Sequence, residues 1–232
     1  MILLIETSTL NCSVALGQPD GTLLDARAES SGQYLHAERL HVLIDDLFSN
    51  SGHQPEDLTA VAVGRGPGSF TGLRIGVSTA KGICTGLHLP LLAPCPLNAL
   101  RHLGIKAHPS YAEQPERVIP AMDARRMELY TFDEVGKPVA AIVDAGFRSD
   151  LGQGPALLVG DGAEKCREAL SDHPADWHFL QAHPTAADLL PEAAALWASD
   201  STENVADFEP FYLKDFIPGK PKDPLGLRAT NT

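Results

Sequence analysis

The sequence lacks both features that would tie the protein to a membrane. No run of apolar residues among the 232 approaches the roughly 20 that a membrane-spanning helix needs. The N-terminal stretch MILLIE has no basic residue ahead of its apolar run and reaches an acid at Glu6, unlike a secretory signal. We therefore expect a cytoplasmic protein. The hydrophobic content of 44% is that of an ordinary globular chain.

Paired cysteines and basic residues are also scarce. The four cysteines include no C-x-x-C pair, which argues against structural zinc and against a disulfide framework. Lys and Arg together number 18 against 30 Asp and Glu, and the formal net charge is −12. Nucleic-acid binding needs clustered basic side chains. We therefore expect a partner to supply the basic surface for any contact with RNA.

The stretch TAVAVGRGPGSFTGLRIG, residues 59–76, organises the rest of the chain. Ala60–Val63 is a short apolar run typical of a buried strand. Phe70–Leu87 is a predicted helix, which either Ser69 or Thr71 would cap.

The glycine loop between that strand and that helix has two possible interpretations, an anion-binding site or a tight turn. A glycine loop before a helix N-terminus is a candidate anion site, because the first turn exposes free N–H groups. Gly66 and Gly68 belong to neither a P-loop nor a dinucleotide pattern, however, and no lysine stands nearby for a phosphate. A tight strand-to-helix turn is the alternative.

The predicted helix contains four glycines, although each costs about 0.5–1 kcal/mol relative to alanine. At about 100° per residue, six small or apolar residues share one face. They are Gly72, Ile75, Gly76, Thr79, Ile83 and Gly86. Such a face forms a shallow groove for the close approach of another backbone, which belongs either to the same chain or to a partner.

The first half of the chain alternates further predicted strands with one more helix. The strands are Ile2–Ile5, Cys12–Leu16, Leu23–Ala28 and Leu91–Ala93. Between the first two, an acid followed by hydroxyls at Glu6–Thr9 suits a phosphate or metal, or an ordinary turn. The helix Leu35–Phe48 has one broad apolar face, with Leu35 and Val42 nearly opposite it, which predicts two neighbours.

The second half begins with a predicted helix at Leu97–Leu103 and a loop at 104–117, where we place a domain boundary. The predicted strands are Val118–Met122, Met127–Phe132, Val139–Val143 and Ala156–Val159, and the predicted helices are Ala163–Leu170 and Thr185–Ser199. Pro191 would kink or break the last helix. The charged turn at Asp123–Arg126 is typical of a solvated hairpin tip.

Five motifs together resemble one family. In chain order over residues 1–215, the motifs are IETST, GRGPGSFTGLRIG, DARRMELY, VGDG and EPFYLK. Together they are similar to the bacterial TsaB family of tRNA threonylcarbamoyladenosine biosynthesis proteins, formerly grouped with glycoprotease-like M22 proteins. The resemblance implies an actin-like, Hsp70-type ATPase (ASKHA) α/β fold of two related subdomains with mixed sheets. We place these at residues 1–103 and 104–217, followed by a mobile tail at 218–232.

The resemblance also implies a function. TsaB-like proteins act with a catalytic paralogue, TsaD, and a small ATPase, TsaE. Together these proteins transfer a threonylcarbamoyl group to the adenosine next to the anticodon of tRNA, and the TsaB-like subunit is non-catalytic. The catalytic paralogue carries an H-x-x-x-H metal pair, and Leu97 and Arg101 stand at the comparable positions here, where neither can ligate a metal.

The implied roles lead to two sets of residues. The predicted partner interface is Leu35, Arg39, Val42, Gly72, Ile75, Gly76, Thr79, Ile83 and Gly86. The predicted degenerate nucleotide-like loops are Glu6, Thr7, Ser8, Gly66, Gly68, Ser69, Gly160, Asp161 and Gly162. We expect no catalytic residue, metal or intrinsic cofactor, with the complex interface as the place for ATP or ADP.

The expected partners are a TsaD-like protein, a TsaE-like ATPase and, through the complex, tRNA; a homodimer is expected when the chain is alone. The alternative function is a free-standing ATP-using enzyme or metallopeptidase of the same superfold. It would use Glu6, Thr7, Asp161 and the loop at 66–69.

Overall fold

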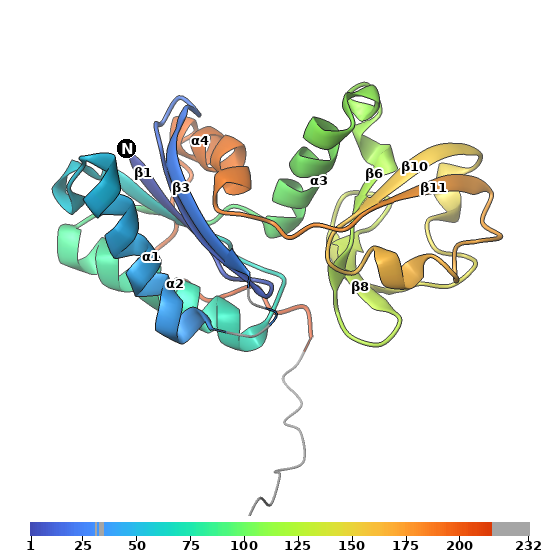
Figure 1. Cartoon of the computed structure of the whole chain (residues 1–232), viewed down its shortest axis with the longest axis horizontal. Coiled ribbons are helices and arrows are strands. Elements are labelled where there is room, and N and C mark those ends of the chain that lie inside the picture. The colour runs from blue at the N-terminus through green and yellow to red at the C-terminus, as the bar shows by residue number, and fades with distance from the viewer. Residues whose placement is uncertain (31, 33–34, 215–232) are drawn as a thin grey trace, which may run out of the picture.

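The computed structural model describes residues 1–30, 32 and 35–214, which form two lobes (Figure 1). The first lobe is built on a five-stranded mixed sheet with strand order β3-β2-β1-β4-β5. β1, β2 and β3 pair antiparallel, whereas β1, β4 and β5 pair parallel. These strands are Ile2–Glu6, Asn11–Gly17, Leu23–Ser30, Ala60–Val63 and Leu91–Leu92.

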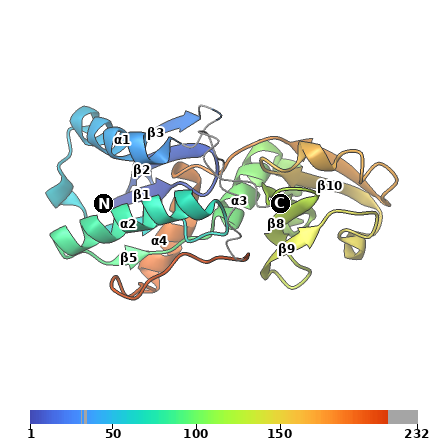
Figure 2. The same ribbon diagram turned by 90° about the horizontal axis from the view of Figure 1, so that it is seen from below.

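Helices cover both faces of this sheet. α1 (His36–Ser51) and α2 (Phe70–Leu87) pack on the face formed by Leu3 and Ile5, as Figures 1 and 2 show. α4 (Leu190–Ala198) packs on the opposite face, formed by Ile2 and Leu4. The alternation follows from the period of two along a strand, and it makes β1 the buried centre of the lobe.

The second lobe holds two small sheets. One is parallel, with order β11-β10-β6, and the other is antiparallel, with order β7-β8-β9. The strands are β6 Val118–Pro120, β7 Met122–Asp123, β8 Glu128–Phe132, β9 Pro138–Ile142, β10 Gly154–Val159 and β11 Ala175–Leu180. α3 (Pro96–Ala107) leads from the first lobe and packs on β6 and β10.

Short 3-10 helices connect the elements at Pro55–Asp57, Pro109–Tyr111, Pro115–Arg117, Ser149–Leu151, Glu164–Cys166 and Ala187–Leu189. No helix of the described residues combines the length and apolarity needed to cross a membrane.

Several predicted elements differ from the structure. α3 continues to Ala107, so the predicted loop at 104–117 begins as helix. The predicted helix Ala163–Leu170 is only a 3-10 turn, Glu164–Cys166, which still buries Ala163, Cys166 and Leu170. β11 is a strand that was not predicted, although its exposure alternates from Ala175 to His178. Pro191 is the second residue of α4, where its missing N–H removes no helical bond.

The chain returns to the first lobe after β11. Beyond α4, Glu203 forms a β-bridge with Leu91 and the Phe211 N–H donates to Arg65 O (2.7 Å). These residues lie within the unit predicted at 104–217, yet they pack on the first sheet. The predicted tail at 218–232 lies outside the described residues.

Candidate functional site

The glycine loop after β4 lies directly on the N-terminal loop after β1. The Ser69 N–H donates to Ser8 O (2.7 Å), and Ser69 Oγ accepts from the Gly72 N–H (3.3 Å) as the cap of α2. A Cβ on Gly68 would lie 2.5 Å from Ser8 O, and one on Gly66, whose φ is +104°, would lie 2.7 Å from Phe211 O. Both glycines therefore make room for the chain's own backbone.

The loop after β1 is buried throughout, from Glu6 to Thr9. Glu6 Oε1 accepts from the Ser8 N–H (2.6 Å), whereas Oε2 has no hydrogen-bond partner among the described residues. Burial raises the pKa of Glu6 to about 7, since the charged carboxylate is desolvated. Thr7 Oγ1 donates to Gly72 O (2.9 Å) and so ties this loop to α2.

This contact corrects the predicted groove on α2. Cβ atoms on Gly72 and Gly76 would overlap Thr7 O and Thr7 Oγ1, so these glycines face the chain's own loop. Thr79 is buried as well. The predicted single face is thus internal along its first half, because the loop after β1 occupies it.

The second half of α2 has one open face, although Cys84 is buried on its other side. A Cβ on Gly82 or Gly86 would have no atom within 4 Å apart from its own helix. Ile75 and Ile83 are half-buried against the core. A groove of about 650 Å³ runs here between α1 and α2 and is lined by Ile44, Phe48, Ile83, Gly86 and Leu87, among others.

The α1 residues of the predicted interface face outward to different degrees. Val42 is 40% exposed, in keeping with its predicted position opposite the apolar face. Arg39 forms an ion pair with Glu29 of β3 (2.7 Å), and Leu35 is half-buried just before the helix. α1 therefore offers one large exposed apolar side chain, Val42, which lies outside the lining of the groove.

The glycine loop of the second lobe is packed in the same way as that of the first. Cβ atoms on Gly160 and Gly162 would overlap Ala121 O and a Leu129 methyl group. Asp161 Oδ1 accepts from the Asp123 N–H (2.8 Å), and burial raises the pKa of Asp161. The glycines again accommodate neighbouring protein atoms, and Asp161 fixes the end of β7.

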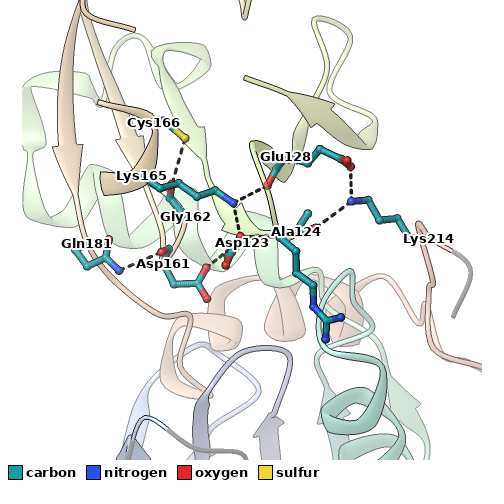
Figure 3. A network of polar contacts seen from close by, with 10 residues as sticks. Asp123, Ala124, Glu128, Asp161, Gly162, Lys165, Cys166, Gln181 and Lys214 are labelled. Atoms are coloured by element: carbon teal, nitrogen blue, oxygen red, sulfur yellow. Dashed lines mark hydrogen bonds and ion pairs between the residues drawn. The ribbon is translucent and has the colours of Figure 1, made fainter. Parts of the chain in front are cut away.

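A network of polar contacts, seen in Figure 3, holds the turn between β7 and β8. Asp123 forms an ion pair with Lys165, which also donates to Glu128 O (2.9 Å). Glu128 forms an ion pair with Lys214, which also donates to Ala124 O (2.9 Å). Sequence reasoning did not single out these lysines, although Lys214 belongs to the EPFYLK motif.

His183 joins the polar loops of the two lobes. Its Nδ1 lies 3.1 Å from Thr9 Oγ1 and 3.7 Å from an Asp161 carboxylate oxygen. His183 thus connects the loop after β1 with the predicted loop at Asp161, while the predicted interface residues lie on α2, on α1 and at Leu35 just before α1.

The two positions compared with a metal pair have structural roles. Leu97 is fully buried. Arg101 Nε donates to Val118 O (3.1 Å), and its guanidinium stacks 4.6 Å from the centre of the Phe132 ring. Within the described ranges, no group of three His, Cys, Asp or Glu side chains is arranged to hold a metal ion.

Comparison with known proteins identifies the family. Residues 31–146 match the family model described as TsaD: tRNA N6-adenosine threonylcarbamoyltransferase. The chain is 32% identical to the tRNA threonylcarbamoyladenosine biosynthesis protein TsaB of Escherichia coli K12, across 94% of this chain and 96% of that protein. The chain belongs to the TsaB family. The TsaB protein of Haemophilus influenzae is 35% identical across 66% of this chain and 58% of its own length.

Solved structures agree with this membership. YeaZ from Pseudomonas aeruginosa is 30% identical, with a TM-score of 0.69, and the match covers 91% of this chain and 99% of that one. A second crystal structure, of a protein described as similar to peptidase YeaZ from P. aeruginosa, gives a TM-score of 0.68 at 30% identity and covers 92% of this chain and 99% of that one. The predicted TsaB resemblance and the actin-like α/β fold are confirmed.

Proposed function

We propose that this TsaB-family chain serves tRNA threonylcarbamoyladenosine biosynthesis as a non-catalytic subunit that binds and activates a TsaD-like transferase. The observation that carries the proposal is the filling of both glycine loops by the chain's own atoms. Ser8 lies against Gly68, and Ala121 lies against Gly160. A phosphate group would have to displace protein backbone at either loop.

The structural use of Leu97 and Arg101 supports the same proposal. The Arg101 guanidinium remains protonated and is held by Val118 O and the Phe132 ring. A metal at this position would need other ligands. We therefore assign the chemistry to the partner, and we place any ATP or ADP at the contact with that partner.

The docking surface that we propose is the open half of α2 together with α1. Ser78, Gly82 and Gly86 are exposed and small, so a partner helix can approach the α2 backbone closely. Val42 adds an exposed apolar contact. In the absence of the transferase the same surface serves a second copy of the chain, and a TsaE-like ATPase and tRNA join the assembled complex.

The test is co-purification with the TsaD-like protein of the same organism, followed by threonylcarbamoyl transfer with each protein alone and with both. We expect transfer only in the mixture. Gly86→Leu should abolish co-purification and transfer while the variant keeps an unfolding midpoint at least as high as that of the wild type, because its new side chain points into open space and leucine favours a helix over glycine.

Gly86→Ala is the matched control, since a methyl group leaves room for a neighbouring helix and should preserve the complex. Transfer or ATP hydrolysis by the chain alone would contradict the non-catalytic role and favour a free-standing enzyme. A Gly86→Leu variant that still forms an active complex would place the interface elsewhere.

A further inference from the structure

The turn between β7 and β8 carries two adjacent arginines in an unfavourable backbone conformation. Arg125 and Arg126 have φ values of 67° and 51°, the left-handed region that glycine and asparagine adopt most readily. They are the only consecutive non-glycine residues with positive φ within residues 1–30, 32 and 35–214. Strained positions of this kind persist where the surrounding structure enforces them and often mark function.

The two guanidinium groups are exposed and have no partner within residues 1–30, 32 and 35–214. Neither makes a hydrogen bond, ion pair or ring contact with the described residues, whereas Arg27, Arg39 and Arg148 each form an ion pair with a carboxylate. The carboxylates beside the turn already form ion pairs with lysines, Asp123 with Lys165 and Glu128 with Lys214. Two positive charges therefore have no direct ion pair among the described residues, on a chain whose net charge is −12.

Aromatic rings continue this positive surface onto the first lobe. Lys214, whose Nζ binds Ala124 O in the turn, also lies 5.8 Å above the Tyr130 ring. The centres of the Tyr212 and Phe70 rings lie 5.0 Å apart, and the Arg74 guanidinium lies 4.9 Å from the centre of the Phe70 ring. Tyr212 remains 38% exposed despite these contacts.

We name this surface the cation–aromatic strip and define it as Phe70, Arg74, Arg125, Arg126, Tyr212 and Lys214. It extends from α2 to the β7–β8 turn by way of Tyr212 and Lys214, and Figure 3 shows Lys214 beside Ala124 of the turn.

We propose that the cation–aromatic strip binds single-stranded RNA. Guanidinium groups pair with phosphates through two parallel hydrogen bonds, and an exposed ring provides a platform for an unstacked base. An acidic protein segment would use the cations but would leave the ring of Tyr212 without a role. The choice of RNA over DNA rests on the proposed function in tRNA modification.

The test measures binding of a fluorescein-labelled oligouridine of about 12 nucleotides by anisotropy, for the chain alone and mixed with the TsaD-like protein. We expect the double variant Arg125→Glu/Arg126→Glu to bind at least about tenfold more weakly in low salt. The slope of log K against log salt should become shallower by about 1.4, the value for two lost phosphate contacts on a single strand.

A matched control is the double variant Lys106→Glu/Lys137→Glu. Both lysine side chains are exposed and make no hydrogen bond or ion pair with the described residues, and the two reversals change the net charge by the same amount. The control should bind the oligouridine like the wild type. An equal loss in the control, or no loss in the arginine variant, would overturn the proposal.

A second variant separates binding from folding. Arg125→Asn/Arg126→Gly places residues that favour left-handed φ in the turn, so we expect an unfolding midpoint at least equal to that of the wild type together with weakened RNA binding. Polyglutamate that competes as well as RNA at equal charge would assign the strip to an acidic protein and overturn the RNA proposal. If the wild-type chain binds the oligouridine but does not co-purify with the TsaD-like protein, the result would instead count against the proposed function alone.

Discussion

The two halves of α2 use the same residue in opposite ways. In the first half, Gly72 and Gly76 lie under Thr7, whose backbone oxygen and hydroxyl fill the space that a side chain would need. In the second half, Gly82 and Gly86 face no atom within 4 Å. The first pair therefore allows the lobe to close on itself, and the second pair leaves a helix surface free for a neighbour.

This difference teaches that glycine spacing reports a close approach but not the identity of what approaches. The sequence pattern placed Gly72, Gly76 and Gly86 on one continuous face. What divides that face is the loop after β1, which runs over the first turns of α2 because β1 and β4 are parallel neighbours. Substitutions at Gly72, Gly82 and Gly86 test this division.

The largest effect is expected at Gly72. A Cβ there would overlap Thr7 O, a backbone atom that cannot turn aside, and Thr7 Oγ1 would lose its bond to Gly72 O. We expect Gly72→Ala to lower the free energy of unfolding by about 3 kcal/mol or more, measured by urea denaturation. A Gly72→Ala variant as stable as the wild type would show that the loop after β1 does not rest on α2.

The next largest effect is a pH dependence at the same loop. Burial raises the pKa of Glu6 from its ordinary value of 4.5 to about 7. The folded state thus holds the proton more tightly than the unfolded chain, so stability is lost as pH rises from about 4.5 to about 7 and is fully present below that window. The difference corresponds to about 3 kcal/mol.

Glu6→Gln removes this ionisation and keeps an oxygen to accept the Ser8 N–H. Relative to the wild type, the variant should gain about 3 kcal/mol of stability between acid and neutral pH. Urea denaturation at a series of pH values checks this. If the free energies of unfolding of the two proteins change in the same way with pH, Glu6 titrates normally and its loop is hydrated.

The elements of this region were predicted well because their signals are local. Ala60–Val63 and Phe70–Leu87 have the predicted bounds, since the apolar run ends at Gly64 and Ser69 caps the helix. β11 was overlooked although Ala175 and Trp177 alternate with polar residues. β11 has too few alternating apolar positions to predict a strand from the sequence alone, and its pairing with the parallel strand β10 is seen only in the structure.

The candidate site was harder to predict because its contacts join distant parts of the chain. The hydrogen bond between Thr7 and Gly72 joins residues that are 65 positions apart in the sequence. The hydrogen bond between Lys214 and Ala124 joins residues that are 90 positions apart. The residue types at Glu6 and Gly68 suited both a phosphate loop and a tight turn. Only the position of Ser8 over the loop shows that protein atoms fill it.

A smaller effect is expected at the cap of α2. Ser69 Oγ accepts from the Gly72 N–H (3.3 Å) at the point where the helix meets the loop after β1. Ser69→Ala should lower the free energy of unfolding by about 1 kcal/mol, as measured by thermal and urea denaturation. Ser78→Ala, at an exposed position within the same helix, is the control and should cause no loss. Equal effects of the two changes would argue that the hydroxyl of Ser69 is bound to water rather than to the helix.

The smallest effect is expected in the open half of α2, with the opposite sign. Gly82→Ala and Gly86→Ala add a methyl group into open space and remove the conformational freedom of glycine from a helix interior. Each should therefore raise the free energy of unfolding by about 0.5–1 kcal/mol, measured on the isolated chain. If either change destabilises the chain instead, a contact covers this half of α2 in the isolated protein. The two halves of the helix would then both be internal, and the docking surface would have to be sought on α1.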